Sequence, residues 1–240
     1  MATEFASDAA RRPKLWWWGA VAAAAVILGI VPALTDMSLQ LDLSILFVFM
    51  LLAMSMGFLW GYAGILSFGQ TIFFGLGGYS YAILAMNMGT TGLPFLIAIL
   101  LPVVFAAVLG YFMIYGQISD IYLSVITLVV TLIFEKSMRS TSGPEYVIGT
   151  VRLNGQNGIP GVPGLVVPWI SDAPLSIAGV FYLSGGLVLC VYVGLRMILT
   201  TRFGRVIVGI RENERRMELL GYDARWYKLL AFMLAALIAS

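Results

Sequence analysis

Polar side chains interrupt an otherwise apolar stretch of the chain between residues 61 and 79. Ser67, Gln70 and Thr71 stand there together with Gly69. Hydroxyl and amide groups donate and accept hydrogen bonds in the same small space. The sequence therefore predicts that Ser67, Gly69, Gln70 and Thr71 contact a small polar ligand such as a zwitterion or an amide.

Residue types that usually carry catalysis or bind metals are scarce. The chain has no histidine, and its one cysteine, Cys190, lies in an apolar run. Histidine is the commonest general base and metal ligand, and one thiol forms no disulfide within the chain. The phosphate-binding pattern G-x-x-x-x-G-K-[ST] is also missing. We therefore predict no catalytic residues, no metal site and no cofactor, and a chain that does not itself hydrolyse ATP.

The glycines around the polar group allow two interpretations. Gly61, Gly64 and Gly69 would break a helix, exposing backbone groups that line a pathway. Gly75, with Gly77 or Gly78, would instead let two membrane helices pack closely. We favour a broken or re-entrant element, and packing alone stays open.

The composition places the chain in a membrane. Hydrophobic residues make up 60% of it and charged residues 11%, against about 25% charged in soluble domains. The net charge of +2 is small and the basic residues are clustered, which argues against nucleic acid as a partner. Lipid is the expected surrounding.

About 20 apolar residues are needed to cross a bilayer as a helix. Runs of this kind predict an all-α bundle with six spans, at 15–34, 41–62, 71–88, 93–114, 121–134 and 177–199. Residues 1–14 form the expected N-terminal tail of one membrane domain, 15–240. A cleaved signal peptide is the alternative for 15–34, although Trp16 to Trp18 favour a retained anchor. Residues 229–240 would rise only about 18 Å, so we expect the sequence to stop inside a further span; a docked half-helix is the alternative.

The basic residues predict the orientation. The segment 200–228 carries seven of them, whereas the loop 135–176 carries only Lys136, Arg139 and Arg152. By the positive-inside rule, the N-terminus and 200–228 lie in the cytoplasm and 135–176 lies outside. The seven are Arg202, Arg205, Arg211, Arg215, Arg216, Arg225 and Lys228.

The segment 200–228 also contains a predicted surface helix, 211–220, with Gly221 at the position of a left-handed cap. Apolar Ile210, Met217 and Leu220 alternate there with charges, a mixture suited to docking in the groove of a partner protein. A solvated amphipathic loop is the alternative. The residues expected to contact the partner are Arg211, Glu212, Asn213, Glu214, Leu220 and Gly221.

Charged residues are missing from the middle of the predicted spans. Asp42, Asp120, Glu135 and Arg196 all fall near span ends. Ionisable groups at mid-membrane usually mark ion coupling. Their absence counts against an ion-driven carrier, although carbonyl and hydroxyl groups alone also hold sodium.

Seven short stretches together resemble the permeases of branched-chain amino acid ABC transporters, over roughly residues 41–240. They are GYAGILSFGQ at 61–70, SGP at 142–144, NGIP at 157–160, RFGR at 202–205, IRENE at 210–214, LGY at 220–222 and YKLLAF at 227–232. The resemblance implies a bacterial inner-membrane subunit that is not an enzyme and works by alternating access. Its implied partners are a second related permease, two ATP-binding subunits and a periplasmic substrate-binding protein.

In such importers a cytoplasmic coupling helix lies in a cleft of the ATPase. By resemblance, residues 211–220 take that place and Gly221 matches the loop glycine, but Glu212, Asn213 and Glu214 stand where many importers have Glu-Ala-Ala. Urea and short-chain amide permeases of the same family carry nearly the same motifs and remain alternatives. An ion-coupled secondary transporter and a membrane enzyme are more distant ones.

Overall fold

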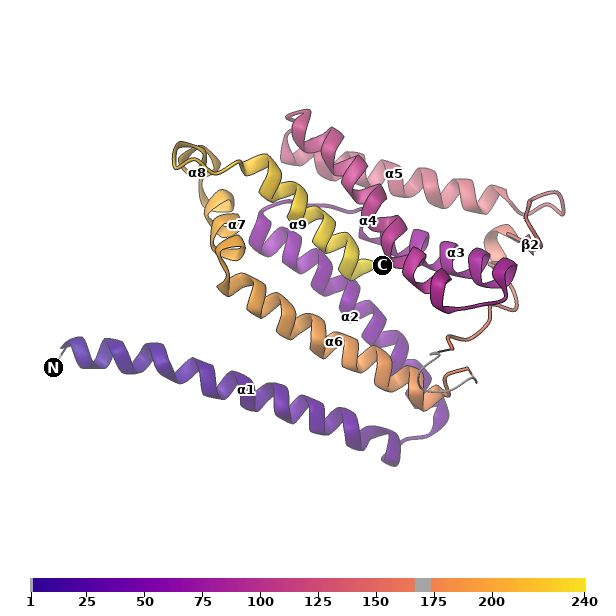
Figure 1. Ribbon diagram of the computed structural model, residues 1–240, viewed down its shortest axis with the longest axis horizontal. Coiled ribbons are helices and arrows are strands. Elements are labelled where there is room, and N and C mark those ends of the chain that lie inside the picture. The colour runs from indigo at the N-terminus through magenta and orange to yellow at the C-terminus, as the bar shows by residue number, and fades with distance from the viewer. Residues whose placement is uncertain (1, 167–173) are drawn as a thin grey trace. The chain divides into compact units, whose positions relative to one another are not determined.

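The computed structural model describes residues 2–166 and 174–240, with side chains from residue 17 onward. The described part of the chain is 78% helical, which confirms the all-α prediction (Figure 1). The described part contains helices α1 (Ala2–Leu34), α2 (Met37–Ala63), α3 (Gln70–Met88), α4 (Gly92–Tyr115), α5 (Asp120–Ser140), α6 (Ile177–Thr200), α7 (Arg202–Glu212), α8 (Glu214–Leu219) and α9 (Ala224–Ala239). It also contains strands β1 (Val147–Ile148) and β2 (Val151–Arg152) and the short 3-10 helix η1 (Gly155–Asn157).

Five of these helices are long and apolar enough to cross a membrane: α1 from Trp17, α2, α4, α5 and α6. The chain is therefore a polytopic membrane protein, as predicted. Helix α3 forms where the span 71–88 was expected. It is not among the five helices that meet the length and hydropathy of a membrane span, so a sixth crossing at α3 stays a prediction.

Helix α5 is longer than predicted. It continues past residue 134 to Ser140, so the irregular connection begins six residues later than expected. Glu135 and Arg139 lie one turn apart on this extension and form an ion pair. Opposite charges four residues apart support a helix, which explains why the charged residues prolong α5 instead of ending it.

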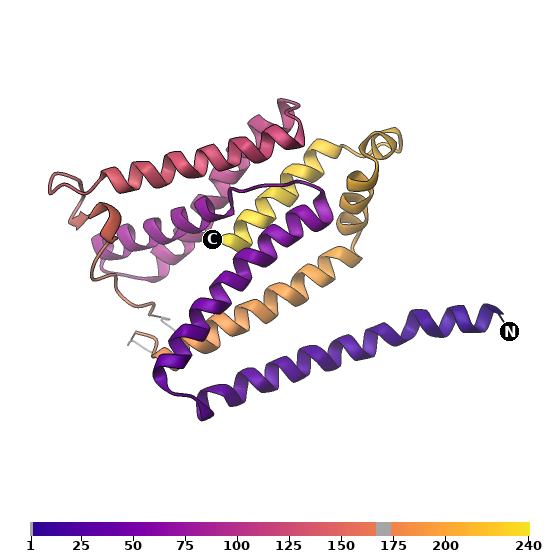
Figure 2. The same ribbon diagram turned by 180° about the vertical axis from the view of Figure 1, so that it is seen from behind.

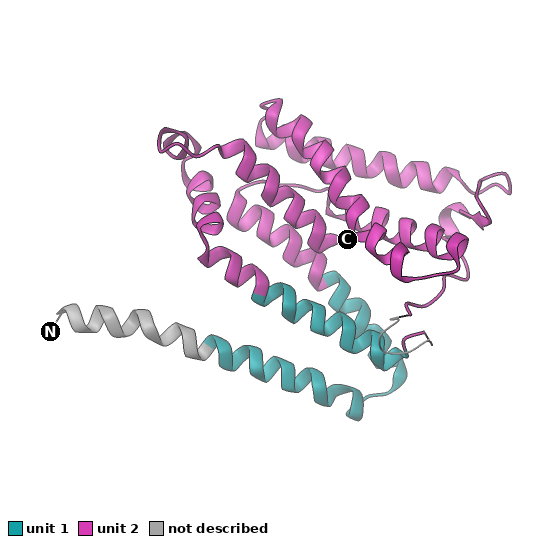
Figure 3. Ribbon diagram, viewed as in Figure 1, with its two compact units in different colours: residues 1–49, 176–193 teal, residues 50–175, 194–240 magenta. Residues whose placement is uncertain are grey.

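The chain divides into two compact units, residues 1–49 with 176–193 and residues 50–175 with 194–240 (Figure 3). In the first unit, α1, α2 and α6 approach closely around Gly185. A Cβ atom there would lie 2.1 Å from Leu28 Cδ1 and 3.1 Å from Phe47. Phe47 also packs on Phe181, with ring centroids 5.4 Å apart. Any side chain at residue 185 would force Leu28 and Phe47 to move.

The second unit has its core between α3, α4 and α9, which lie side by side in both ribbon views (Figures 1 and 2). Phe73 of α3 meets Phe232 of α9 edge to face at a centroid distance of 5.6 Å. At Gly110 of α4, a Cβ atom would lie 2.9 Å from both Leu229 and Phe232. Small residues let membrane helices approach in this way.

The connection after α5 is folded against α3. Strands β1 and β2 pair antiparallel, and the Asn87 side chain on α3 holds their turn. Asn87 Nδ2 donates to the carbonyl oxygen of Ile148 at 3.0 Å, and Thr150 N–H donates to Asn87 Oδ1 at 2.8 Å. This stretch is therefore tied to the helix bundle of its own unit.

Candidate functional site

The chain leaves helical structure between Ala63, where α2 ends, and Gln70, where α3 begins (Figure 2). Gln70 contacts Ser55 of α2, eight residues before the end of that helix. At 1.5 Å per residue, this is about 12 Å back along α2. Residues 64–69 therefore run back beside α2 as irregular backbone before α3 starts, which confirms the predicted break. We call residues 64–69 the break.

The break begins with a tight turn at Gly64. Its φ of +73° lies in the left-handed region, which favours glycine because a Cβ atom is strained there. Ile65 N–H donates to the carbonyl oxygen of Leu59 at 3.2 Å and closes the turn. A Cβ at Gly64 would also lie 2.9 Å from Cγ of Arg211. Conformation and space both require glycine.

The rest of the break is bonded to α5. Phe68 N–H donates to Thr127 Oγ1 at 3.1 Å, and Gly69 N–H donates to Ser67 Oγ at 3.2 Å. A Cβ at Gly69 would lie 3.1 Å from Thr127 Cβ. Irregular backbone away from water needs such partners. Ser67 and Gly69 thus have structural roles within the chain.

Gln70 connects three helices. Only 5% of it is exposed, and Ser55 Oγ lies 2.8 Å from its amide oxygen and 2.7 Å from the carbonyl oxygen of Ala235 on α9. A hydroxyl has one proton to donate. Both contacts are therefore satisfied when the amide nitrogen of Gln70 faces Ser55 and donates to its Oγ, while the Ser55 hydroxyl donates to the carbonyl oxygen of Ala235. The other amide atom of Gln70 then has no partner in the described part of the chain.

Thr71 faces a cavity. It lies with Gly75 and Tyr79 along one side of α3, opposite Thr131 and Phe134 of α5, around a volume of about 330 Å³. Of the four predicted contact residues, Thr71 is thus the one that lines this cavity, while Ser67, Gly69 and Gln70 support the break beside it.

Ser55 and Thr127 hold the site together but were not predicted from the sequence. Each is a hydroxyl residue within a largely apolar helix. Such hydroxyls often bond across to a neighbouring helix, and this is the signal that marks them. Both glycine interpretations also apply, at different positions. Gly64 and Gly69 lie in the break, and Gly75 packs against Phe134. The prediction that Gly61 also breaks the helix is wrong, because Gly61 lies within α2.

The predicted single helix 211–220 is wrong, because the chain is divided at Asn213. Helix α7 ends at Glu212 and α8 begins at Glu214, with Asn213 in an extended conformation between them. Asn213 Oδ1 accepts a hydrogen bond from Arg216 N–H at 2.9 Å. Asparagine favours this N-cap role over a place inside a helix, which explains the division.

The predicted cap at Gly221 is present. Its φ is +88°. Gly221 N–H donates to the backbone carbonyl oxygen of Glu218 at 2.9 Å, and Tyr222 N–H donates to that of Met217 at 3.2 Å. These are the two hydrogen bonds of a Schellman motif. The motif ends α8 and turns the chain toward α9.

The apolar residues of this segment point to different places. Ile210 is buried in the core of its own unit, so its predicted contact with a partner is wrong. Met217 packs on Gly209. Leu219 and Leu220, by contrast, are 85% and 67% exposed. The exposed leucines, together with the exposed Glu212, form the surface that a partner can reach.

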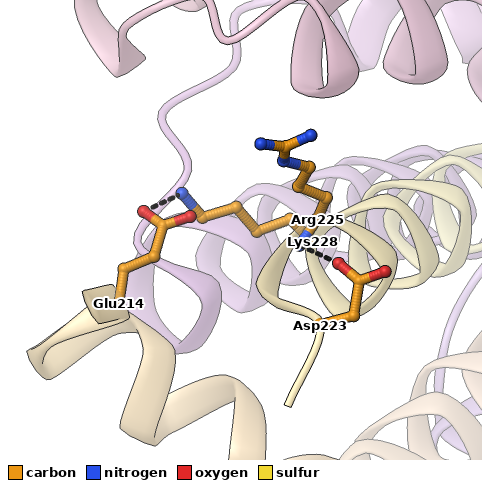
Figure 4. A network of polar contacts seen from close by, with 4 residues as sticks. All are labelled: Glu214, Asp223, Arg225 and Lys228. Carbon is orange, nitrogen blue, oxygen red and sulfur yellow. Dashed lines mark hydrogen bonds and ion pairs between the residues drawn. The ribbon is translucent and has the colours of Figure 1, made fainter. Parts of the chain in front are cut away.

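Two of the predicted contact residues are bonded inside the chain. Arg211 donates to the carbonyl oxygen of Gly61, next to the break. Glu214 of α8 forms an ion pair with Lys228 of α9 at 2.7 Å (Figure 4). The α7–α8 segment is thus fastened to the break at one point and to α9 at another.

Comparison with known proteins agrees with this architecture. Neither the curated proteins nor the solved structures contain a match. A family model described as the permease component of branched-chain amino acid transport systems matches residues 39–240. The match includes the break, α7, α8 and α9. The chain therefore belongs to the family of branched-chain amino acid transport system permease components.

Proposed function

We propose that this chain is a membrane subunit of an ATP-binding cassette importer that moves branched-chain amino acids across a bacterial inner membrane. It pairs with a second related permease and two ATP-binding subunits, and a periplasmic binding protein delivers the substrate. The observation that carries this proposal is the α7–α8 segment in a permease of this family. Its exposed Leu219, Leu220 and Glu212 give an ATPase groove both apolar and charged groups to bind.

The proposed orientation follows from charge. The N-terminus and the basic segment 200–228 lie in the cytoplasm, where the positive-inside rule puts them. The ATP-binding subunits are cytoplasmic, so this orientation brings α8 to them. The folded connection between α5 and α6 then faces the periplasm and the binding protein.

The internal bonds of α7 and α8 suggest how movement is passed on. Closure of the ATP-binding subunits pushes α8, and the Glu214–Lys228 ion pair carries the push to α9. Through Arg211, α7 pulls on the Gly61 carbonyl in the last turn of α2, just before the break. Packed elements with two arrangements convert such small shifts into opening and closing. The break is the proposed gate of this subunit.

The proposed pathway passes the break on its α5 side. Thr71 and Thr131 provide hydroxyls in the cavity of about 330 Å³, which is within the usual range for small-ligand sites. Gly69 N–H donates to Ser67 Oγ within the break, and Gln70 bonds to Ser55 of α2, which also donates to Ala235 of α9. In this proposal Thr71 touches the substrate and the other three predicted contact residues hold the gate in place.

Uptake by the reconstituted complex tests this function. Both permeases and the two ATP-binding subunits are placed in liposomes with binding protein outside and ATP inside, and uptake of labelled leucine, urea and acetamide is measured. We expect leucine uptake that requires ATP. The matched control is a complex whose ATP-binding subunits lack the phosphate-loop lysine.

The other outcomes assign other functions. ATP-dependent uptake of urea or acetamide without leucine would identify an amide importer. Leucine uptake driven by a sodium or proton gradient, without ATP-binding subunits, would identify a secondary transporter. Either result would contradict the proposed function.

A further inference from the structure

A second cavity lies at the end of the second unit where α8, the start of α9 and the start of α5 meet the break. Its volume is about 420 Å³, again within the usual range for small-ligand sites. Ile65 of the break, Ile114 of α4 and Leu123 of α5 give it aliphatic lining. These three are among the buried residues of the core cluster, so the apolar wall is firmly held.

Beside the uncharged Gln117, Ile118 and Ser119, the remaining lining is charged, with both signs present. Asp120, Glu214, Glu218, Arg225 and Lys228 all border the cavity. Lys228 and Glu214 pair with each other, but among the described residues Arg225, Asp120 and Glu218 form no ion pair. In Figure 4 the Arg225 side chain leaves α9 in a different direction from Lys228, away from Glu214. A guanidinium and two carboxylates are thus available to a ligand.

These groups define the ligand's chemistry. An arginine fork binds a carboxylate with two hydrogen bonds, and carboxylates bind an ammonium group. A simple anion would meet Asp120 and Glu218, and a simple cation would meet Arg225. A ligand that carries one negative and one positive group can pair with Arg225 and with the two carboxylates at once. The aliphatic wall suits a branched hydrocarbon side chain.

We infer that this cavity binds a zwitterionic α-amino acid with an aliphatic side chain from the cytoplasmic side. Arg225 holds its carboxylate, Asp120 and Glu218 hold its ammonium group, and Ile65, Ile114 and Leu123 receive its side chain. The inference rests on the proposed function for its orientation and its amino acid. It adds a second site, separate from the Thr71 cavity, that senses substrate already inside the cell.

Binding there has a consequence for transport. The cavity is bordered by the break, α8 and α9, the elements proposed to move in the cycle. A ligand that joins Arg225 on α9 to Asp120 on α5 favours the arrangement in which both walls are close, and so shifts the population toward it. Internal leucine should therefore slow ATP-driven uptake.

Direct binding tests the inference. The complete complex, in nanodiscs of phosphatidylglycerol and without binding protein, is titrated with radiolabelled leucine. Arg225→Gln and Asp120→Asn should each weaken binding by about tenfold or more, because each removes a charged hydrogen-bond partner. Arg215→Gln removes a charge from the same segment outside the cavity and should bind like the wild type. Isoamylamine and isovalerate, with one charge each, should compete poorly with leucine.

Three results would overturn it: wild-type binding in Arg225→Gln, competition by either single-charge compound equal to that of leucine, or loss of leucine binding when phosphatidylethanolamine is added. The last would show that a zwitterionic headgroup fills the cavity. Leucine uptake is measured separately, with the complex in liposomes, binding protein outside and ATP inside. Normal uptake with unchanged binding in Arg225→Gln would reject this site alone, whereas absent uptake would reject the proposed function.

Discussion

Among single residues, Gly64 and Arg211 show how the break and the α7–α8 segment depend on each other. Gly64 turns the chain in a left-handed conformation, and the Arg211 stem lies where a side chain at residue 64 would stand. Arg211 then reaches the carbonyl oxygen of Gly61, one turn earlier on α2. A side chain at residue 64 would disturb both the turn and this bond.

Gly64→Ala should therefore destabilise the protein. The left-handed conformation costs an alanine about 1–2 kcal/mol, and the contact with Arg211 adds to that. The measurement is thermal unfolding in detergent. Gly61→Ala is the matched control, because residue 61 is helical and has open space around its Cβ position. It should be neutral or stabilising by about 0.5–1 kcal/mol; equal losses in both variants would argue against the special role of Gly64.

Gln70 and Thr71 are neighbours with different expected effects. Gln70→Leu removes the amide that joins α2, α3 and, through Ser55, α9. It should lower the free energy of unfolding by about 1–3 kcal/mol and reduce uptake.

Thr71→Val keeps the shape of the side chain but removes a hydroxyl from the cavity, so it should lower uptake while leaving the unfolding temperature unchanged. Unchanged uptake in Thr71→Val would place the pathway elsewhere.

At the scale of elements, α8 depends on its tethers. It has six residues, and so short a helix is not stable alone in water. Its position comes from the Asn213 cap, the packing of Met217 on Gly209, and the Glu214–Lys228 ion pair. The ion pair connects α8 to α9, and so offers a direct test of how movement is passed on.

Glu214→Lys should reduce leucine-stimulated ATP hydrolysis severalfold, because two positive charges then face each other between α8 and α9. Adding Lys228→Glu restores opposite charges and should recover most of the coupling. The measurement is ATPase activity of the reconstituted complex with loaded binding protein. If the double variant is no better than Glu214→Lys, then residue 214 acts on a partner and not through Lys228.

The elements were predicted from the sequence with two errors of the same kind. Apolar runs located α2, α3, α4 and α6 closely, since hydrophobic length decides such helices. They ended α5 too early, because the Glu135–Arg139 pair lets a helix continue through charged residues. They also missed the division at Asn213, where one side-chain hydrogen bond competes with helix continuation. A hydropathy pattern does not detect local ion pairs or hydrogen bonds of side chains.

At the scale of the whole molecule, the candidate sites were only partly predictable. The sequence pointed to residues 67–71 and 211–221, and both stretches do form distinct structures. It did not indicate that Ser55 contacts both Gln70 and Ala235, or that Arg225 borders the same cavity as Asp120. Such groupings arise from helix packing between distant parts of the chain, which spacing along the sequence does not specify.

The orientation of the whole chain can be measured with a thiol reagent that does not cross membranes. Cys190 is first replaced by serine, since it is exposed, and single cysteines are placed at the exposed residues Ile148 and Leu219. Ile148→Cys should label in intact cells, and Leu219→Cys only after the membrane is opened. The reverse pattern would invert the proposed topology.

The most direct test is substrate-stimulated ATPase activity of the complete complex in which exposed residues of the α7–α8 segment are changed. Glu212 and Leu219 are exposed. Glu212→Lys and Leu219→Asp should therefore fold normally, yet bind the ATP-binding subunits less well in pull-downs and lose most of the stimulation by leucine-loaded binding protein. Wild-type pull-down and wild-type stimulation in both variants would show that α8 is a solvated loop, and would contradict the claim that this permease is driven through it.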